Sequence, residues 1–437
     1  MKSLKKAFAA GLAAATMLSM AACGSSSSAQ GTDESDEQIT LNVWAWEPTL
    51  TDVAEAFEEE NPNITIEITN AGTADDQYKA LNNAISAGNG APDVAQVEYY
   101  AISQYALNGS LLDLSDLGAS EYDDFYTPGT WSSVNVNDGI YGLPMDSGPM
   151  ALFYNKAIFD QAGVTEPPTT MDEYYEAAKK IHALGDDYYI TADSGEAYVE
   201  ELMIWIAGGH PFKVDGENIE IDLLNDSGYQ TFKEYWQKMI DEGLIDTKTV
   251  RWSDEWSRSL NEGTLASLTI GAWMASMLDD NAPDQSGNWR VAATPQFDAD
   301  NVSNAEDGGS TLGIMASSDK VEAAWKFIDF ASHSDEGIKI RVDQGQFPAD
   351  KATLASDDFK NKTDAYFGDQ KFNEVLSEAA DTVNTEWQFL PYDVYARSIF
   401  GDSAGQAAVG GTTFDEGYQT WEDQLKQYGV DQGYTVQ

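Results

Sequence analysis

Cysteine, histidine and basic residues are scarce in this chain of 437 residues. Its single cysteine, Cys23, rules out a disulfide or a thiolate metal site within one molecule. The three histidines, His182, His210 and His333, are too far apart in sequence for a local metal-binding motif. No H-E-x-x-H, EF-hand, G-x-x-x-x-G-K-[ST] or G-x-G-x-x-G pattern occurs, so we expect neither a metal nor another cofactor.

Positive charge is also in short supply, because 24 Lys and Arg residues face 74 Asp and Glu residues, a net charge of −50. Such a chain repels phosphate backbones and anionic membrane surfaces, which excludes nucleic acid as a partner. The hydrophobic share of 42% and the aromatic share of 11% are nevertheless those of a protein with a real core. At this length, two large domains or three ordinary ones fit.

The N-terminus predicts export and anchoring. Residues 1–22 combine a basic start with a short apolar stretch and small residues, the layout of a signal peptide, and no other stretch is long and apolar enough to span a bilayer. Residues 20–24 resemble a bacterial lipobox, although Met20 stands where leucine is usual. The resemblance implies that Cys23 carries fatty acyl chains such as palmitate and anchors an extracytoplasmic protein to the cell membrane. Ordinary secretion with a chance cysteine is the alternative.

After Cys23 the chain is polar as far as residue 38 and reads as a flexible tether, so 23–38 is expected to be a lipidated linker. The periods that follow predict a strand over 39–46, a helix that starts with a capping box at Thr49, a strand over 64–68 and a helix over 77–87. This order is typical of a parallel α/β sheet. The same pattern returns in a helix capped by Thr170 and Glu173, and in another that carries Tyr229, Phe232, Trp236 and Met239.

Several segments together resemble one protein family. They are Pro92-Asp93-Val94, Asp138 to Pro144, Leu152 to Phe159 with Ala162-Gly163, and the helix Ala323 to Phe330. In this order, and with the lipobox, they are similar to the extracellular solute-binding proteins of family 1, the sugar-binding lipoproteins of bacterial ABC importers. The resemblance implies a two-lobed α/β fold of the periplasmic-binding-protein type, with parallel-rich sheets flanked by helices and a ligand cleft at a hinge. It places lobe 1 at 39–148 plus 298–345, and lobe 2 at 149–297 plus 346–437.

By this resemblance the protein is a monomeric, lipid-anchored subunit that captures a neutral sugar, above all an oligosaccharide, and delivers it to the permease subunits without catalysing a reaction. The alternative is an exported glycoside hydrolase or another carbohydrate-active enzyme, which needs two carboxylates at a set spacing. With 74 acidic residues any pair could be nominated, so the sequence gives that idea no specific support. Residues 401–405 match G-x-S-x-G, but all three histidines precede Ser403, so we expect a loop there.

Binding of an oligosaccharide calls for aromatic rings over the sugar C–H faces and for carboxylates or amides that hydrogen-bond the hydroxyls. The tryptophan candidates are Trp46, Trp205, Trp252, Trp256, Trp273 and Trp387. The polar candidates at strand ends and at the lobe crossings are Glu47, Glu98, Tyr99, Asp146, Ser147, Asp307 and Gly308. Trp273 is expected to end a strand over 268–273, and Trp252 and Trp256 to share one face of a helix. Core packing is the alternative for each tryptophan, solvated surface for the acids and a turn for 307–309.

Overall fold

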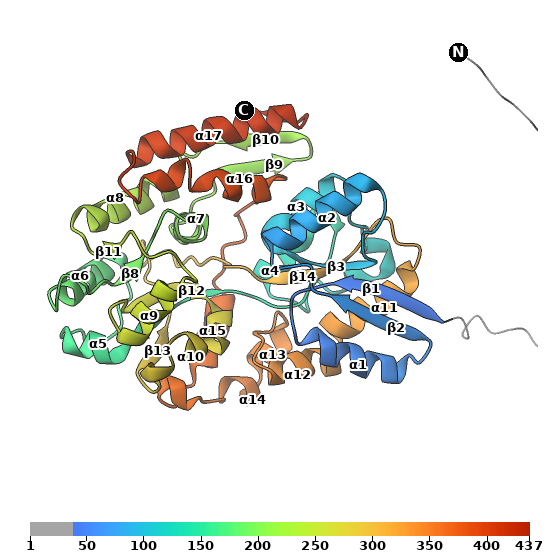
Figure 1. Cartoon of the computed structure of the whole chain (residues 1–437), viewed down its shortest axis with the longest axis horizontal. Helices are drawn as coiled ribbons and strands as arrows, with labels where there is room; N and C mark the ends of the chain where they lie inside the picture. Colours follow the sequence, from blue (N-terminus) through green and yellow to red (C-terminus); the bar gives the residue numbers. More distant parts are fainter. Residues whose placement is uncertain (1–37) are drawn as a thin grey trace, which may run out of the picture. The chain divides into compact units, whose positions relative to one another are not determined.

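The computed structural model describes residues 38–437, and the labels of its helices and strands are those of Figure 1. The predicted signal peptide, Cys23 and nearly all of the predicted tether lie outside the described residues. Within 38–437 no helix combines the length and the apolar character that a membrane crossing requires.

The first sheet has the strand order β2-β1-β3-β14-β6. Its strands are β1 (Ile39–Trp44), β2 (Ile64–Thr69), β3 (Val94–Glu98), β6 (Leu143–Pro144) and β14 (Ser310–Ile314). β1 pairs in parallel with β2 and β3, as the strand and helix order predicts, but β14 runs antiparallel to β3 and β6. The sheet is mixed because β14 joins it from a distant part of the chain. The local hydrophobic period does not predict that pairing.

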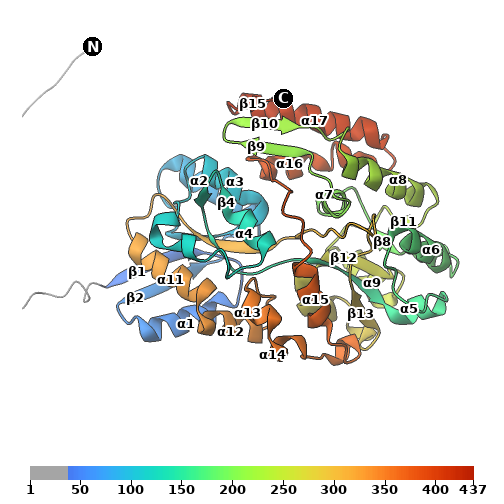
Figure 2. The ribbon, with the colours of Figure 1, turned by 180° about the vertical axis from the view of Figure 1, so that it is seen from behind.

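Helices cover both faces of this sheet (Figures 1 and 2). They are α1 (Leu50–Glu60), α2 (Asp75–Ala87), α3 (Tyr99–Leu107), α11 (Val321–His333) and α12 (Asp335–Asp343). Successive strand residues point to opposite faces, so Val94 packs with the core under α1 and α11, while Ala95 packs with the core under α2 and α3. The capping box predicted at Thr49 is wrong: its hydroxyl makes no bond among the described residues, and the Glu47 carboxylate instead accepts the Thr49 N–H (3.1 Å).

The second sheet has the order β12-β7-β13, with β7 (Met150–Asn155), β12 (Ser267–Gly271) and β13 (Trp289–Ala292). Both outer strands run antiparallel to β7, so the expectation of parallel-rich pairing does not hold in this sheet. β7 is buried along its whole length, with Leu152 in the core on one face and Phe153 in the core on the other. A strand covered on both faces gives no alternation from which its direction could be inferred.

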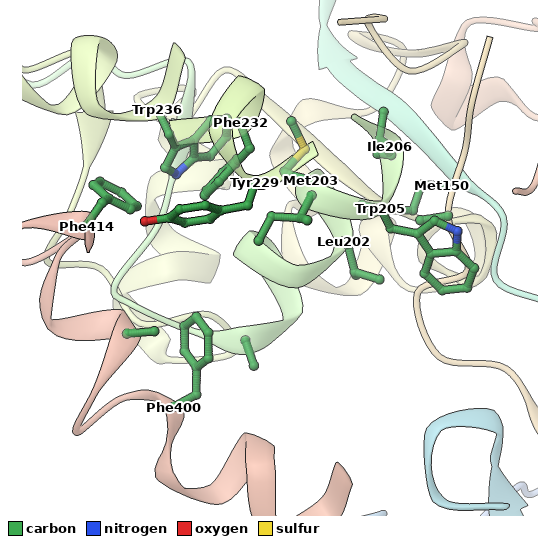
Figure 3. Packing of buried hydrophobic residues seen from close by; sticks show 14 of the residues in the cluster. Met150, Leu202, Met203, Trp205, Ile206, Tyr229, Phe232, Trp236, Phe400 and Phe414 are labelled. Carbon is green, nitrogen blue, oxygen red and sulfur yellow. The ribbon is translucent and has the colours of Figure 1, made fainter. Parts of the chain in front are cut away.

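The helices grouped with the second sheet are α5 (Lys156–Gln161), α6 (Met171–His182), α7 (Ala197–Ile206), α8 (Ser227–Asp241), α9 (Asp254–Glu262), α10 (Leu278–Asn281) and α15 (Phe372–Ala380). α6 begins as predicted, because the Thr170 hydroxyl accepts the N–H of Glu173 (3.2 Å). α8 buries the apolar stripe that the sequence predicts, and Figure 3 shows its Tyr229, Phe232 and Trp236 gathered together.

The remaining elements complete the described chain. The helices are α4 (Pro128–Val134), α13 (Lys351–Ala355), α14 (Asp357–Lys360), α16 (Asp393–Phe400) and α17 (Phe414–Asp431). The short strands are β4 (Asn135–Val136), β5 (Gly139–Ile140), β8 (Thr191–Ala192), β9 (Phe212–Asp215), β10 (Asn218–Ile221), β11 (Ile245–Asp246) and β15 (Thr435–Val436). The G-x-S-x-G segment follows a helix, α16, rather than a strand, and the Ser403 hydroxyl donates to the Ile399 carbonyl (2.7 Å), so it is a loop as predicted and not a nucleophile elbow.

Chain segments between the two sheets lie next to one another (Figures 1 and 2). Residues 145–149 link β6 to β7, and residues 293–309 link β13 to β14. The Ser147 hydroxyl donates to the Glu306 carboxyl (3.0 Å), and the Ser147 N–H donates to the carbonyl of Phe347 (3.2 Å), which follows α12. These crossing segments are therefore hydrogen-bonded to each other. The bounds of the two lobes stay a prediction.

Candidate functional site

Side chains from both sheets meet at the crossing segment 306–309. Glu98 ends β3 of the first sheet, and Trp273 follows β12 of the second. A Cβ added to Gly308 would lie 3.5 Å from Trp273 Nε1 and 3.8 Å from Glu98 Oε1. Gly308 has a φ of +72°, which favours glycine, so the backbone can pass closely between the two groups.

Asp307 holds the second-sheet side of this meeting point. Its buried carboxylate accepts hydrogen bonds from Arg251 Nη2 (3.1 Å) and from the Gly271 N–H (3.2 Å). Its backbone carbonyl accepts the indole N–H of Trp273 (2.6 Å). Asp307 was predicted as a ligand-binding residue, and the structure shows it orienting Arg251 and Trp273. We call Glu98, Arg251, Trp252, Trp273 and Asp307 the junction site.

Three tryptophans form a cluster around Arg251. The Trp252 ring lies 4.9 Å from that of Trp256 and 5.8 Å from that of Trp273, and the Arg251 guanidinium lies 5.4 Å from the ring centres of both Trp252 and Trp273. Trp256 is buried, whereas Trp252 is 47% exposed. Trp252 and Trp256 do not share a helix face, because Trp252 has a φ of +66° and α9 begins only after the capping residue Ser253.

Trp273 lies in a short 3₁₀ turn (Ala272–Ser276) instead of ending the strand predicted over 268–273. β12 stops at Gly271: the N–H of Ala272 still donates to the Pro149 carbonyl (3.0 Å) in the register of the ladder, but Pro149 has no N–H to donate in return. The turn brings the Trp273 indole next to Asp307 and leaves the side chain partly exposed.

A second arginine, Arg397 on α16, continues the junction site toward the first sheet. Its Nε lies 3.1 Å from carboxylate oxygens of both Glu201 and Asp393. Its guanidinium lies 4.2 Å from the Tyr100 ring centre and 5.4 Å from that of Tyr198. Burial would lower the pKa of Arg397, but the two carboxylates raise it and the net shift is upward.

Tyr198 connects the two arginines, because its ring also lies 5.9 Å from the Arg251 guanidinium. The side chain is 36% exposed. Sequence reasoning missed Tyr198, Arg251 and Arg397. The available signal was the rarity of arginine in so acidic a chain, together with the position of Arg251 directly before Trp252.

Glu98 is held by two hydrogen bonds to one tyrosine. The Tyr78 hydroxyl accepts the Glu98 N–H (2.8 Å) and donates to Glu98 Oε2 (3.3 Å). Burial raises the pKa of Glu98 to about 7, although Arg397 and the neighbouring tyrosines act in the opposite direction. The carboxyl can therefore donate as well as accept a hydrogen bond near neutral pH.

Trp46 and Glu47 lie just beyond β1, where Gln96 Oε1 accepts both of their N–H groups (3.0 Å each). Gln96 also donates to the Ser310 hydroxyl (2.9 Å), which ties this turn to β14, and its role was not predicted. The Trp46 ring packs edge to face on Tyr78 at 6.4 Å and is partly exposed. Trp46 therefore borders the junction site through the tyrosine that holds Glu98.

Three further candidates use their polar groups inside the protein. The buried Tyr99 hydroxyl donates to the Asp146 carbonyl (2.6 Å), and Ser147 is bonded to Glu306. The Asp146 carboxyl accepts the N–H (2.6 Å) and the hydroxyl (2.9 Å) of Ser310. Burial, and then repulsion from Glu47, raise the pKa of Asp146 to about 6. In this structure these groups join the crossing segments to the first sheet.

The last two tryptophan candidates are packed against each other. The rings of Trp205 and Trp387 stack at 5.2 Å with a 12° angle between their planes, and the residues are only 2% and 8% exposed. The Trp205 indole N–H donates to the Asn384 carbonyl (2.8 Å). Figure 3 shows Trp205 beside Met150, away from the aromatic cluster of α8. This geometry is typical of core packing.

Exposed rings, two paired arginines and a carboxyl converge in this arrangement. Within residues 38–437 no group of three or more His, Cys, Asp or Glu side chains is placed to hold a metal ion. Aromatic faces and fixed hydrogen-bonding groups of this kind recognise a ligand that has both apolar and polar surfaces.

Comparison with known proteins gives consistent results. Residues 45–338 match the family described as bacterial extracellular solute-binding protein. The chain is 49% identical to an ABC transporter-associated binding protein from B. animalis subsp. lactis, solved in complex with β-1,6-galactobiose, with a TM-score of 0.82 over 91% of this chain and 99% of that one. It also resembles the galacto-N-biose/lacto-N-biose I-binding protein of the ABC transporter from Bifidobacterium longum, solved with lacto-N-biose (24% identity, TM-score 0.79, 92% and 99% covered).

Among curated relatives, the lactose-binding protein of Rhizobium radiobacter is 24% identical over 408 residues, which cover 88% of this chain and 92% of the relative. The two-lobed fold and the sugar-binding role in import that the sequence predicts are confirmed at this level. The chain belongs to the family of bacterial extracellular solute-binding proteins.

Proposed function

We propose that this protein captures a neutral, galactose-containing oligosaccharide at the junction site for uptake by an ABC importer. The observation that carries the proposal is the convergence of Glu98 from the first sheet with Arg251, Trp252 and Trp273 from the second. A ligand placed there would contact both sheets at once.

The aromatic groups of the junction site suit the C–H face of a sugar ring. Trp252 is 47% exposed, Trp273 is partly exposed, and Tyr198, which lies beside the site, is 36% exposed. Trp252 also keeps a left-handed backbone conformation that a bulky residue rarely adopts. Strained backbone conformations are concentrated at functional sites, where the surrounding structure maintains them.

The polar groups suit hydroxyls rather than a charged ligand. Arg251 is already paired with Asp307, and Arg397 with Glu201 and Asp393, so neither arginine needs an anionic ligand. The Nε–H of Arg251 is nevertheless buried and has no acceptor among residues 38–437. A sugar hydroxyl could accept from this group, because buried donors are nearly always hydrogen-bonded.

The relatives narrow the choice of sugar. The two Bifidobacterium proteins were solved with β-1,6-galactobiose and with lacto-N-biose, and the Rhizobium relative is named for lactose. All three sugars contain galactose. The 49% identity to the galactobiose-binding protein makes a galactobiose the first ligand to test.

Closure is the proposed mechanism of capture. We infer that residues 39–148 and 298–345 act as one lobe, and residues 149–297 and 346–437 as the other, with a sugar at the junction site favouring the closed arrangement. A ligand shifts such an equilibrium only through contacts that it makes better in one state. The closed monomer would then be the form that the permease subunits receive.

Anchoring and the absence of turnover belong to the same proposal. Cleavage after residue 22 and lipidation of Cys23 would hold the folded part outside the cell on the tether of residues 23–38. We expect the bound sugar to be returned unchanged. Incubation with β-1,6-galactobiose and chromatography of the mixture tests this, and products that grow with protein concentration would favour the glycoside hydrolase.

Calorimetric titration of β-1,6-galactobiose against the full chain and two variants tests the site. Trp252→Ala and Trp273→Ala each remove roughly 60–100 Å² of ring surface that the sugar would cover. At ~25 cal/mol per Å² each variant should lose about 1.5–2.5 kcal/mol of binding free energy, which raises Kd more than tenfold. The matched control is Trp325→Ala, which removes a partly buried indole from α11.

Urea unfolding of the same proteins separates binding from stability. If the Kd of Trp252→Ala and of Trp273→Ala equals that of the wild type and of the control Trp325→Ala, the sugar binds elsewhere. No heat of binding from the folded wild-type protein with galactobiose, lactose or lacto-N-biose would reject the galactose-containing class.

A further inference from the structure

We propose that a groove between α2 and α3 on one side and α16 and α17 on the other binds the outer sugar residues of oligosaccharides longer than a disaccharide. The proposal rests on the proposed function, since the inner residues would occupy the junction site. The groove has a volume of about 1040 Å³, at the upper end of the ~300–1,000 Å³ typical of ligand pockets, which leaves room for more than one sugar ring. Figures 1 and 2 show the helices on its two sides.

One wall of the groove is built from tyrosines. Tyr395 of α16 and Tyr428 of α17 stack at 3.6 Å with an 11° angle between their planes, and Tyr392 lies 5.4 Å from Tyr428 and 5.9 Å from Tyr434. All four line the groove, and Tyr395, Tyr428 and Tyr434 are partly exposed. A packed row of tyrosines offers rigid ring surface with hydroxyl groups at its edge, at little cost in side-chain entropy.

The opposite wall presents amides. Asn83 of α2 and Gln104 of α3 line it, and neither side-chain amide takes part in a hydrogen bond with the residues described. A carboxamide can donate and accept at the same time, as a sugar hydroxyl also does. The two walls therefore combine the ring surface and the neutral hydrogen-bonding groups that a carbohydrate needs.

The shortage of charge in the groove distinguishes it from the rest of the protein. Its charged lining residues are Asp75, Lys79 and Glu217, in a chain with 74 acidic residues and a net charge of −50. A protein partner or cation attracted by the acidic surface would find a weaker field here than elsewhere. The groove favours an uncharged ligand, in agreement with a neutral oligosaccharide.

The groove is joined to the junction site through α16. Arg397 of this helix packs over Tyr100 beside Glu98, while its neighbours Tyr395 and Ser398 face the groove. Asp75 at the start of α2 also lines the groove, and it lies close enough to Arg397 for the guanidinium to lower the pKa of its carboxyl, against a larger upward effect of burial. A chain that leaves the junction site past Arg397 would enter the groove directly.

Titration of the full chain, purified in detergent, with β-1,6-galactobiose and with β-1,6-galactotetraose tests the proposal. We expect the tetraose to bind the wild-type protein about tenfold more tightly than the biose, a difference of about 1.4 kcal/mol. Tyr395→Ala and Gln104→Ala should remove most of this gain and change the Kd of the biose by less than about twofold. Tyr175→Ala, which truncates a partly exposed tyrosine of α6, is the matched control and should alter neither Kd.

Two results would overturn the proposal. The first is that the tetraose binds no more tightly than the biose, and the second is that both groove variants weaken the binding of the two sugars equally. Gln104→Ala guards against misfolding, because it removes an amide without internal hydrogen bonds, whereas Tyr395→Ala also unstacks Tyr428. If only the groove proposal is wrong, the wild-type protein still binds the biose. Failure of the biose to bind the folded wild-type protein would instead reject the proposed function and the groove with it.

Discussion

Replacing Glu306 with glutamine should stabilise the folded protein at pH 7.5 relative to the wild type, and this advantage should disappear at pH 5. Glu306 is buried in the crossing segment between β13 and β14. Its carboxyl accepts hydrogen bonds from the Ser147 hydroxyl (3.0 Å) and the Gly148 N–H (2.7 Å). Burial raises its pKa from 4.5 to about 8, although both hydrogen bonds act in the opposite direction.

The direction of the pH effect follows from proton binding. In the unfolded chain the carboxyl loses its proton near pH 4.5, whereas in the folded protein it keeps the proton until about pH 8. Between these values the folded state binds more protons than the unfolded state, so the free energy of unfolding falls as the pH rises. Each pH unit in this window costs the wild type about 1.4 kcal/mol, and glutamine does not titrate.

The difference in unfolding free energy between E306Q and the wild type should therefore grow by about 3 kcal/mol from pH 5 to pH 7.5. This change does not depend on how well the amide fits, since a poor fit shifts both ends equally. Glutamine can keep the contact with Gly148 through its oxygen and donate to the Ser147 hydroxyl.

Urea unfolding at half-unit steps between pH 5 and pH 8, followed by tryptophan fluorescence and by circular dichroism, measures the effect. Glu60→Gln, which alters an exposed side chain at the end of α1, reports the consequence of removing one charge from this acidic protein. A stability difference that stays constant across this range would refute the reasoning, because it would mean that Glu306 is ionised in the folded state throughout.

Three further outcomes are expected. Arg397→Met should lower the free energy of unfolding by urea at pH 7.5 by about 3–5 kcal/mol, because Glu201 and Asp393 lose the cation that compensates their burial. Arg258→Met, at an exposed i,i+3 pair, is the control and should lower it by less than about 1 kcal/mol. Similar losses in both variants would contradict this. Trp387→Ala should lower the free energy of unfolding by about 3–5 kcal/mol and leave sugar affinity nearly unchanged, since the ring is stacked in the core; a selective loss of affinity would make it a ligand contact. Cys23→Ser should move the protein from the membrane fraction to the medium with unchanged sugar affinity, and continued membrane association would disprove the lipid anchor.

The candidate site could be predicted only in part. Position at strand ends and lobe crossings selected Glu98, Trp273 and Asp307, which the structure brings together. Sequence position could not distinguish the site residue Trp273 from the core residues Trp205 and Trp387. A tryptophan in an apolar segment has the same local pattern in the core and at a ligand site. Arg251 was missed because Asp307, the partner that orients it, is far away in sequence. Arg397 has one distant partner, Glu201, and one nearby partner, Asp393, four residues before it on α16.

The sequence by itself determined those features that depend on neighbouring residues. The apolar period of α8, the cap of α6 and the parallel start of the first sheet follow from side chains a few positions apart. The tertiary structure alone decided the antiparallel entry of β14, the antiparallel second sheet and the turn at Trp273. These features depend on contacts between residues that are far apart in sequence. Tertiary packing selects the neighbouring strand and the carboxylate beside an arginine, and neither choice produces a periodic pattern in the sequence.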